Sequence, residues 1–462
     1  MMRICNWVLH AAIIGQATCL QGSNFNITPE FAVQNGCDEK CQATLAKVNA
    51  IDLGIFGQNF DFDWFATASN FSGSKPGDVL KMQAMDPKML GEQVKQGTTV
   101  YRIQYASVDL DNSTVPATGF IALPFAPASL KSKASNSSSS YQFPLVAYAH
   151  GTSGVYRGCA PSNGPALYDY DSWQLLLQRG YAVVATDYAG LGNNQTEHKY
   201  CSFPVQVNDI VYSVVAARKA MGNIFTQEWM AVGHSEGGGA VWKLAESRFA
   251  KDDSKYLGTV SLAPALKIAD MLRNHTDFIL KSGYLTLVAK ALQRFSPSYN
   301  FTMLGQVQRQ RMAIADASQP CLIAQGAISV GLTREQVLDE KGFETDLQLL
   351  QSWQDKMAPA SGGRTSAPLL LVQGLNDTAV VAQVAHESWQ QACQDQSEVH
   401  LREYTELDHS GVIVAAASEW LAWVDARFNG EATSGNCTRL QRVPFDAAHV
   451  IAPPEKPEDA DA

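Results

Sequence analysis

The sequence has no cluster of positive charge. Its 462 residues include 35 lysines and arginines against 45 aspartates and glutamates, which gives a formal net charge of −10. Proteins that bind nucleic acid gather basic side chains on one face, so we expect no nucleic-acid partner. Beyond the N-terminus, no apolar run is long enough to span a bilayer, so we expect no transmembrane segment.

The spacing patterns of metal ligands are also missing. No CxxC pair and no group of histidines matches the arrangement of a structural zinc site, so we predict neither a metal nor another cofactor. The hydrophobic content of 46% and the charged content of 17% are typical of a globular protein with a large core.

The N-terminus has the pattern of a secretory signal. In "MMRICNWVLHAAIIGQATCLQG", Arg3 supplies the positive start, Ile4 to Ala17 form a mostly apolar centre, and small residues follow. We therefore expect residues 1–21 to be a signal peptide and the protein to be secreted. A buried helix is the alternative for this segment.

Nine Asn-x-Ser/Thr sequons support secretion independently, because this is more than chance would give. The sequon at Asn376 adjoins a candidate catalytic residue, where a glycan would crowd the site, so we do not expect it to be used. The other eight are predicted glycosylation sites: Asn26, Asn70, Asn112, Asn136, Asn194, Asn274, Asn300 and Asn436.

The chain has nine cysteines, and seven remain if Cys5 and Cys19 leave with the signal peptide. In an oxidising compartment most of these should be paired, with one left over. Spacing alone does not assign the pairs.

The middle of the chain alternates strands with helices. Residues 22–97 show no clear period and are expected to be an N-terminal extension that packs on the core. From residue 98, "TTVYRIQYASVDL" and "VPATGFIALP" predict a hairpin closed by "DNST". The apolar runs "FPLVAYAHG", "YAVVATDYAG", "WMAVGHS" and "GTVSLAPAL" follow, with helical stretches between them. This pattern predicts a mostly parallel sheet flanked by helices, an α/β fold whose first part is residues 98–263.

The alternation stops over residues 264–367, where no strand pattern appears, and resumes with "APLLLVQG" in residues 368–430. An insertion of this length is much longer than an ordinary crossover. We interpret it as a helical cap over the site, the alternative being a subdomain without a role there. Residues 431–462 are expected to be a C-terminal tail.

The stretch "WMAVGHSEGGGAVWKLAE" predicts a strand, a sharp turn and a helix around Gly233-x-Ser235-x-Gly237. This is the context of a nucleophile elbow, in which small neighbours allow the serine to adopt a strained backbone conformation. The Glu236 N–H would then donate to an oxyanion at the helix N-terminus. A plain glycine-rich turn is the alternative.

A nucleophilic serine needs a base and an acid that orients the base. Among the later histidines, only His409 follows a final strand and precedes the last helix, so we choose it as the base. Asp377 directly follows the strand "PLLLVQG" and is our candidate acid. The alternatives are that Asp377 only caps a helix or that Asp408 orients the base.

The loop "AHGTSGVYRGC" follows an early parallel strand, at the position that donates the second oxyanion N–H. Gly151 or Thr152 would supply it. An ordinary glycine-rich turn is again the alternative.

With these residues assembled, the chain resembles the secretory lipase family of α/β-hydrolases, from about Pro76 to Phe428. The resemblance rests on "PGDVL", "VPATGFIALP", "AYAHGTSG", "CAPS", "VVATDYAGLG", "VGHSEGGGA" and "LLLVQGLNDTAV". It implies a serine esterase acting on acylglycerols or similar esters, with a large helical lid and with Ser235, Asp377 and His409 as the triad. It also implies disulfides between Cys159 and Cys321 and between Cys393 and Cys437.

One residue departs from the family pattern, because Glu236 stands where Gln or Gly is more usual. Its carboxylate would alter the electrostatics beside the nucleophile. We therefore expect a secreted ester hydrolase that meets a lipid or ester substrate, at an oil–water interface for a lipase. An aminopeptidase or other amide hydrolase on the same fold, and a non-catalytic lipid-binding module, are the alternatives.

Overall fold

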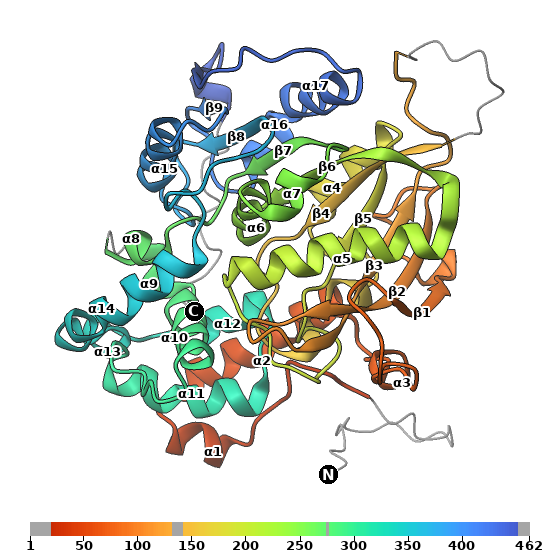
Figure 1. The fold of residues 1–462 in the computed structure, drawn as a ribbon. Coiled ribbons are helices and arrows are strands. Elements are labelled where there is room, and N and C mark those ends of the chain that lie inside the picture. The colour runs from red at the N-terminus through yellow and green to blue at the C-terminus, as the bar shows by residue number, and fades with distance from the viewer. Residues whose placement is uncertain (1–19, 132–141, 274–276, 451–462) are drawn as a thin grey trace.

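A computed structural model describes residues 20–131, 142–273 and 277–450 (Figure 1). The predicted signal peptide therefore lies almost wholly outside the described residues, as do the sequons at Asn136 and Asn274.

A ten-stranded sheet crosses the molecule in the order β1-β2-β3-β5-β4-β6-β7-β8-β9-β10. The first pairings, from β1 to β5, are antiparallel, and all the others are parallel. This confirms the predicted mostly parallel sheet. The strands are β1 (Val79–Ala84), β2 (Thr99–Val108), β3 (Thr114–Leu123), β4 (Phe143–Ala149), β5 (Ala182–Thr186), β6 (Phe225–His234), β7 (Tyr256–Leu262), β8 (Leu369–Gly374), β9 (Val399–Tyr404) and β10 (Thr438–Arg442).

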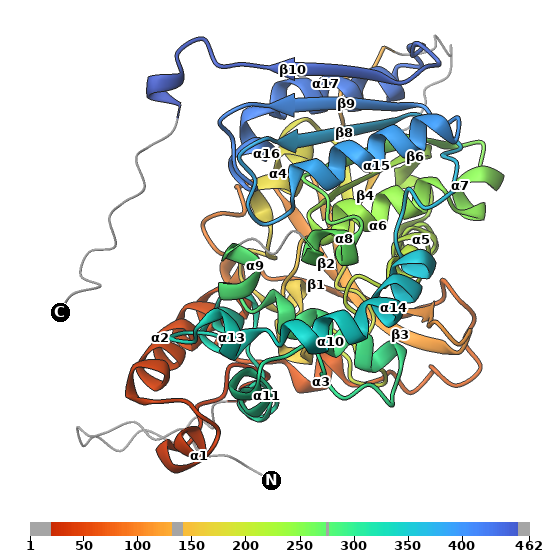
Figure 2. The ribbon, with the colours of Figure 1, turned by 90° about the vertical axis from the view of Figure 1, so that its left-hand side faces the viewer.

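Helices cover both faces of the sheet (Figures 1 and 2). One layer contains α5 and α6, which pack on each other and on the central strands, and the opposite layer contains α4, α16 and α17. Every residue of β5 and β8 is buried, which explains their continuous apolar sequences. The helices of this part are α4 (Tyr170–Gln178), α5 (Phe203–Met221), α6 (Glu236–Ala245), α7 (Arg248–Asp252), α15 (Ala382–Gln394), α16 (Gly411–Ala415) and α17 (Ala417–Phe428).

The predicted hairpin is present. Strands β2 and β3 pair in antiparallel register from Thr99↔Leu123 to Val108↔Thr114, and the Asp109 N–H donates to the Ser113 carbonyl across the turn. The aspartate, asparagine and serine residues of this turn have the chemistry that tight turns require.

The segment between β7 and β8 is helical, as its sequence predicts, and none of its described residues forms a strand. Its helices gather at one end of the molecule, next to the sheet (Figures 1 and 2). We call residues 264–367 the helical insertion. It contains α8 (Ile268–Arg273), α9 (Asp277–Lys281), α10 (Tyr284–Phe295), α11 (Gln306–Ser318), α12 (Leu322–Ala327), α13 (Arg334–Val337) and α14 (Glu340–Met357).

The N-terminal extension is more ordered than its sequence suggests. It contains α1 (Pro29–Gln34), α2 (Glu39–Phe56) and α3 (Phe62–Phe65), and its end forms the edge strand β1. Helix α2 packs on α12, and Leu45 shares a small apolar cluster with Ile314 and Ala324 of the helical insertion. Part of this extension therefore packs on the insertion rather than on the sheet.

Residues 431–450 also differ from the expected tail, because β10 adds to the sheet beside β9. Its sequence, "TRLQR", is largely exposed and charged, which is typical of a protected edge strand and is hard to recognise as a strand.

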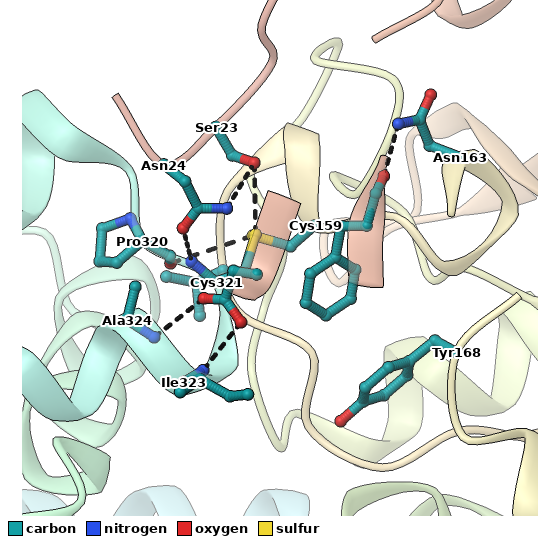
Figure 3. The surroundings of a disulfide bond; sticks show 12 residues. Ser23, Asn24, Cys159, Asn163, Tyr168, Pro320, Cys321, Ile323 and Ala324 are labelled. Atoms are coloured by element: carbon teal, nitrogen blue, oxygen red, sulfur yellow. Dashed lines mark hydrogen bonds between the residues drawn. A yellow bond between two sulfur atoms is a disulfide. The ribbon is translucent and has the colours of Figure 1, made fainter. Parts of the chain in front are cut away.

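Three disulfides join cysteines of the described chain. Both pairs implied by the family resemblance are present, Cys159–Cys321 and Cys393–Cys437, and a third joins Cys37 to Cys41. Cys201 is a buried free thiol. Figure 3 shows that the Cys159–Cys321 bond ties a core loop after β4 to the start of α12.

Candidate active site

Ser235 occupies the turn between β6 and α6. Its backbone angles are φ 55° and ψ −118°, a conformation that few residues other than glycine adopt. The turn is held from both sides, because the Ser235 N–H donates to the Leu262 carbonyl and the Ser235 carbonyl accepts from Ala265. The turn therefore directs the Ser235 hydroxyl away from the axis of strand β6.

The glycines of the motif are required by close backbone contacts. A Cβ atom on Gly233 would lie 2.2 Å from the Gly237 carbonyl oxygen, and one on Gly237 would lie 2.0 Å from the Ala149 carbonyl oxygen. A Cβ on Gly239 would lie 2.1 Å from the Ala265 oxygen. Helix α6 therefore approaches the sheet only because these side chains are absent.

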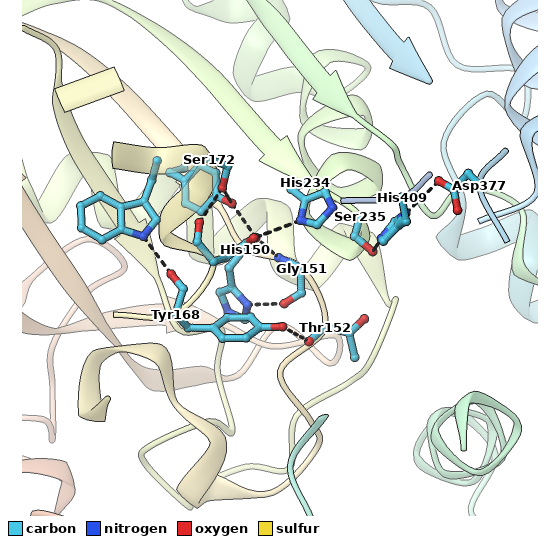
Figure 4. Close-up of polar contacts among 12 residues, drawn as sticks. His150, Gly151, Thr152, Tyr168, Ser172, His234, Ser235, Asp377 and His409 are labelled. Carbon is cyan, nitrogen blue, oxygen red and sulfur yellow. Dashed lines mark hydrogen bonds and ion pairs between the residues drawn. The ribbon is translucent and has the colours of Figure 1, made fainter. Parts of the chain in front are cut away.

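The three predicted catalytic side chains meet at the carboxyl edge of the sheet (Figure 4). His409 follows β9, and its Nε2 lies 2.9 Å from Ser235 Oγ. Its Nδ1 lies 2.8 Å from Oδ2 of Asp377, which follows β8. The imidazole can therefore accept the serine proton on one nitrogen while the carboxylate fixes the other.

Asp377 also organises its own loop. Its Oδ1 accepts from the backbone of Ala379 and Val380, both at 2.9 Å, and its Oδ2 accepts from Gln373 Nε2 at 3.1 Å. Helix α15 begins only at Ala382, so Asp377 does not cap a helix: its Oδ1 holds the turn that follows it, while its Oδ2 faces His409. The alternative acid, Asp408, is exposed and accepts from the Gly411 N–H at 2.7 Å, at the start of α16.

Other described histidines have other partners. His386 Nδ1 lies 3.1 Å from Glu403, and His400 lies between Thr438 and Glu398. His449 is exposed and pairs with Asp446. His275 lies outside the described residues.

One of the predicted oxyanion donors must be corrected. The Gly151 N–H donates to Asp169 Oδ2 at 2.9 Å, so it is not available to an oxyanion. Thr152 is the next residue of the loop. The Glu236 N–H occupies the first position of α6, where a helix has no acceptor of its own.

Side chains hold the peptide units on both sides of Thr152. His150 Nδ1 lies 2.6 Å from the Gly151 carbonyl oxygen, and Tyr168 donates to the Thr152 carbonyl at 2.5 Å. Because N–H and C=O of a trans peptide point in opposite directions, the first contact sets the direction of the Thr152 N–H. The His150 ring packs on Tyr188, whose hydroxyl donates to the His150 carbonyl.

Sequence reasoning missed Asp169 and the role of His234. Besides Gly151, the Asp169 carboxylate accepts from Tyr148 at 2.6 Å and contacts His234 Nδ1 at 3.1 Å. Asp169 has a left-handed backbone with φ 48°, as do Leu167 and Tyr168 before it. No residue preference in "ALYDYD" signals this conformation, so the sequence offered no means of finding it.

The Glu236 side chain is buried, and its Oε1 contacts the segment before α5 and the start of α5. Its Oε1 accepts from Gln206 Nε2 at 2.5 Å and from the Cys201 N–H at 3.1 Å, and lies 3.4 Å from His198 Nε2. Burial alone would raise the pKa of Glu236, but the contact with His198 and the Cys201 hydrogen bond together lower it. The carboxylate therefore holds the loop before α5 in place.

The helical insertion lies against the site. Ser235 is only 4% exposed. Tyr284 of α10 shares a side-chain hydrogen bond with Thr152, and Arg294 of the same helix donates to the carbonyls of Val155 and His198. Ser235 is thus largely shielded from solvent in this conformation.

Comparisons with known proteins agree with this architecture. A sequence model of the secretory lipase family matches residues 168–436. No curated protein sequence matches the chain.

Among the described residues, no helix combines the length and apolar character needed to cross a membrane.

Solved structures of lipases and esterases share the fold. Lipase A of Candida antarctica in its closed state has a TM-score of 0.60 at 14% identity, covering 82% of this chain and 89% of that one. A ligand-bound rice cell wall degrading esterase LipA from Xanthomonas oryzae has a TM-score of 0.57 at 15% identity, covering 77% and 98%. A putative hydrolase from Legionella pneumophila has 0.59 at 16%, covering 77% and 100%.

These likenesses show the α/β-hydrolase fold, and the family model covers more than half of the sequence. The chain therefore belongs to the secretory lipase family, and this membership supports a hydrolase that acts on esters.

Proposed function

We propose that the protein is a secreted serine hydrolase that cleaves carboxylic esters through an acyl-enzyme on Ser235, with acylglycerols as its substrate class. One observation carries this proposal: Ser235 Oγ, His409 and Asp377 are joined by contacts of 2.9 and 2.8 Å at the edge of the sheet. Their order along the chain, serine then acid then histidine, is that of this fold.

In the proposed reaction, Ser235 Oγ attacks the ester carbonyl while His409 Nε2 takes its proton. Asp377 stabilises the resulting imidazolium through Nδ1. The Thr152 and Glu236 N–H groups hold the tetrahedral oxyanion. His409 returns the proton to the leaving alcohol as the C–O bond breaks. Water, activated by the same imidazole, then attacks the acyl-enzyme and releases the carboxylic acid.

The helical insertion acts as a cap in this proposal. The low exposure of Ser235 and the contacts of α10 with the loop after β4 mean that α10 or its neighbours must move before an ester reaches the nucleophile. The Cys159–Cys321 bond limits that motion, because it anchors the start of α12 to the core.

Secretion and glycosylation are part of the proposal. The described sequons at Asn26, Asn70, Asn112, Asn194, Asn300 and Asn436 are all exposed, and three disulfides suit an oxidising compartment. Asn376 is exposed too, but it adjoins Asp377, so a glycan there would obstruct the edge of the site.

The amide-hydrolase alternative has less support. An aminopeptidase needs a carboxylate that faces the substrate amine, whereas Glu236 is 1% exposed and is held by Cys201, Gln206 and His198. The test compares the turnover of 4-nitrophenyl octanoate with that of an aminoacyl 4-nitroanilide. We expect the ester to be cleaved much faster, and a preference for the anilide would overturn the proposal.

A further inference from the structure

A second carboxylate–imidazole pair lies beside the three proposed catalytic residues, and the mechanism above does not use it. Asp169 stands at the start of α4, and both of its carboxylate oxygens lie 3.1 Å from His234 Nδ1. His234 is the residue directly before Ser235. Figure 4 shows its ring between the oxyanion loop and His409.

The surroundings of Asp169 and His234 show which of the two side chains carries the hydrogen in the contact between them. The Asp169 carboxylate accepts hydrogen bonds from the Tyr148 hydroxyl at 2.6 Å and from the Gly151 N–H at 2.9 Å, and both favour its ionised form against the effect of burial. Asp169 is therefore an ionised carboxylate at neutral pH and can only accept. It follows that His234 Nδ1 carries the hydrogen.

The surroundings of the other ring nitrogen, Nε2, indicate that the His234 ring is neutral. His234 Nε2 is buried and has no hydrogen-bond partner among the described residues. A protonated ring would leave a charged N–H donor unpaired there, which is costly, whereas a neutral ring leaves only a lone pair. The arrangement therefore favours the neutral Nδ1–H tautomer.

This neutral ring packs on the proposed base. The centroids of His234 and His409 are 4.8 Å apart, and their planes are inclined by 38°. An imidazolium on His409 would then contact an electron-rich ring whose far side is bound to a carboxylate. Both the ring and the negative charge stabilise a positive charge on His409.

The backbone leading to Asp169 has a strained conformation, which places the Asp169 carboxylate beside His234. Leu167, Tyr168 and Asp169 have φ values of 57°, 46° and 48°, although none is a glycine. Such a run persists only where several contacts determine it, and here Trp173 donates to the Tyr168 carbonyl while Asp169 accepts from three groups. Strain of this kind is concentrated at functional sites.

We propose that Asp169 and His234 are positioning residues for the esterase reaction, holding a neutral, polarised imidazole against His409 so that the imidazolium formed during attack by Ser235 is stabilised. This rests on the proposed function. No proton moves on or off His234 during turnover; the serine proton passes to His409 Nε2 and then to the leaving alcohol.

The groups that face His234 set the expected pH response. They are Asp169 at the start of α4, His409 with Asp377 behind it, and Tyr148 of β4 through Asp169. Burial holds the pKa of Tyr148 well above its ordinary value, so that hydroxyl stays neutral. Asp169 is thus the negative charge whose removal should change the titration of His409.

The test is the pH profile of kcat/KM on 4-nitrophenyl octanoate. Asp169→Asn keeps the shape of the side chain and an oxygen that accepts from Gly151, but removes the charge. We expect kcat/KM at neutral pH to fall about three- to tenfold and the acid limb, which reports His409, to move about 0.5 to 1 pH unit lower. His234→Phe keeps an aromatic ring beside His409 and leaves Asp169 charged, so its acid limb should move less than that of Asp169→Asn.

Tyr148→Phe is the matched control, because it removes a hydrogen bond to Asp169 without removing the charge, and its acid limb should stay in place. An Asp169→Asn protein with the wild-type melting temperature and an unshifted limb, or a limb moved to higher pH, would overturn the proposal. Loss of activity without a shift would mean that Asp169 only supports the fold. If the wild type is not labelled at Ser235 by a fluorophosphonate, the proposed function itself fails instead.

Discussion

His409 Nε2 lies 2.9 Å from Ser235 Oγ, although the two residues are 174 positions apart in the chain. The sheet accounts for this proximity. Ser235 follows β6 and His409 follows β9, and both strands run parallel, so their carboxyl ends reach the same edge. Asp377, after β8, arrives at the same edge between them.

Replacement of Asp377 by asparagine should abolish most of the activity while leaving the fold intact. The amide would no longer hold His409 with a hydrogen on Nδ1, and the imidazolium would lose its counter-charge. We expect kcat to fall roughly 10³- to 10⁴-fold. Asp408→Asn is the matched control, because Asp408 adjoins His409 but contacts the Gly411 N–H instead, and its kcat should remain near that of the wild type. Equal losses in the two variants would contradict the assignment.

Gly237→Ala should disrupt the elbow. The added Cβ would lie 2.0 Å from the Ala149 carbonyl oxygen, so α6 must move away from the sheet. We expect a large fall in melting temperature together with loss of activity. Gly54, in the exposed part of α2, has no atom within 4 Å of such a Cβ. Gly54→Ala should therefore stabilise the protein by about 0.5–1 kcal/mol. Thermal unfolding of both variants distinguishes the steric clash expected at Gly237 from the gain in helix propensity expected at Gly54.

The disulfides should contribute unequally to stability. In the chain-entropy account, a loop of 162 residues closed by Cys159–Cys321 stabilises by about 5 kcal/mol, and a loop of 4 closed by Cys37–Cys41 by about 2 kcal/mol. Replacing both cysteines of each pair by alanine, followed by denaturant unfolding, tests this order. A larger loss for the Cys37–Cys41 pair would mean that packing, not loop closure, dominates.

Asp52 should make stability depend on pH. It is buried in α2 and accepts from the N–H groups of Ile323 and Ala324 at the start of α12. Burial raises the pKa of Asp52 to about 6, and these two hydrogen bonds oppose the rise only in part. Because the folded pKa exceeds the unfolded one, the contribution of Asp52 is fully present below about pH 4 and is lost as the pH rises through 6. The loss amounts to about 3 kcal/mol.

Asp52→Asn tests this, since asparagine does not ionise. The melting temperature of the variant relative to the wild type should increase by a few degrees between pH 4 and pH 7. A difference that does not change with pH would show that Asp52 stays neutral or keeps the same pKa on unfolding.

Much of the site could be predicted because parallel strands constrain it. Once β6, β8 and β9 are recognised from their apolar runs, the residues that follow them must share an edge. The glycines around Ser235 then identify the nucleophile, and His409 and Asp377 follow from their places after strands.

The oxyanion loop could not be resolved in the same way. Whether the Gly151 or the Thr152 N–H is free depends on Asp169, which lies 18 residues further along and reaches Gly151 through a left-handed backbone. The edge strands β1 and β10 were missed for another reason. Strand β10 is largely exposed and carries two arginines and a glutamine, whereas β1 is mostly half-buried and largely apolar, so neither shows the alternation that marks a strand with one buried face.

The most direct test of the account is active-site labelling with a fluorophosphonate, combined with turnover of 4-nitrophenyl octanoate, in the wild type and in Ser235→Ala. Ser388→Ala is the control, because Ser388 is a fully buried serine of α15 whose hydroxyl has no hydrogen-bond partner among the described residues. We predict that the wild type and Ser388→Ala are labelled and active, whereas Ser235→Ala is folded, unlabelled and at least about 10⁴-fold slower. Labelling or undiminished turnover in Ser235→Ala would contradict the assignment of Ser235 as the nucleophile.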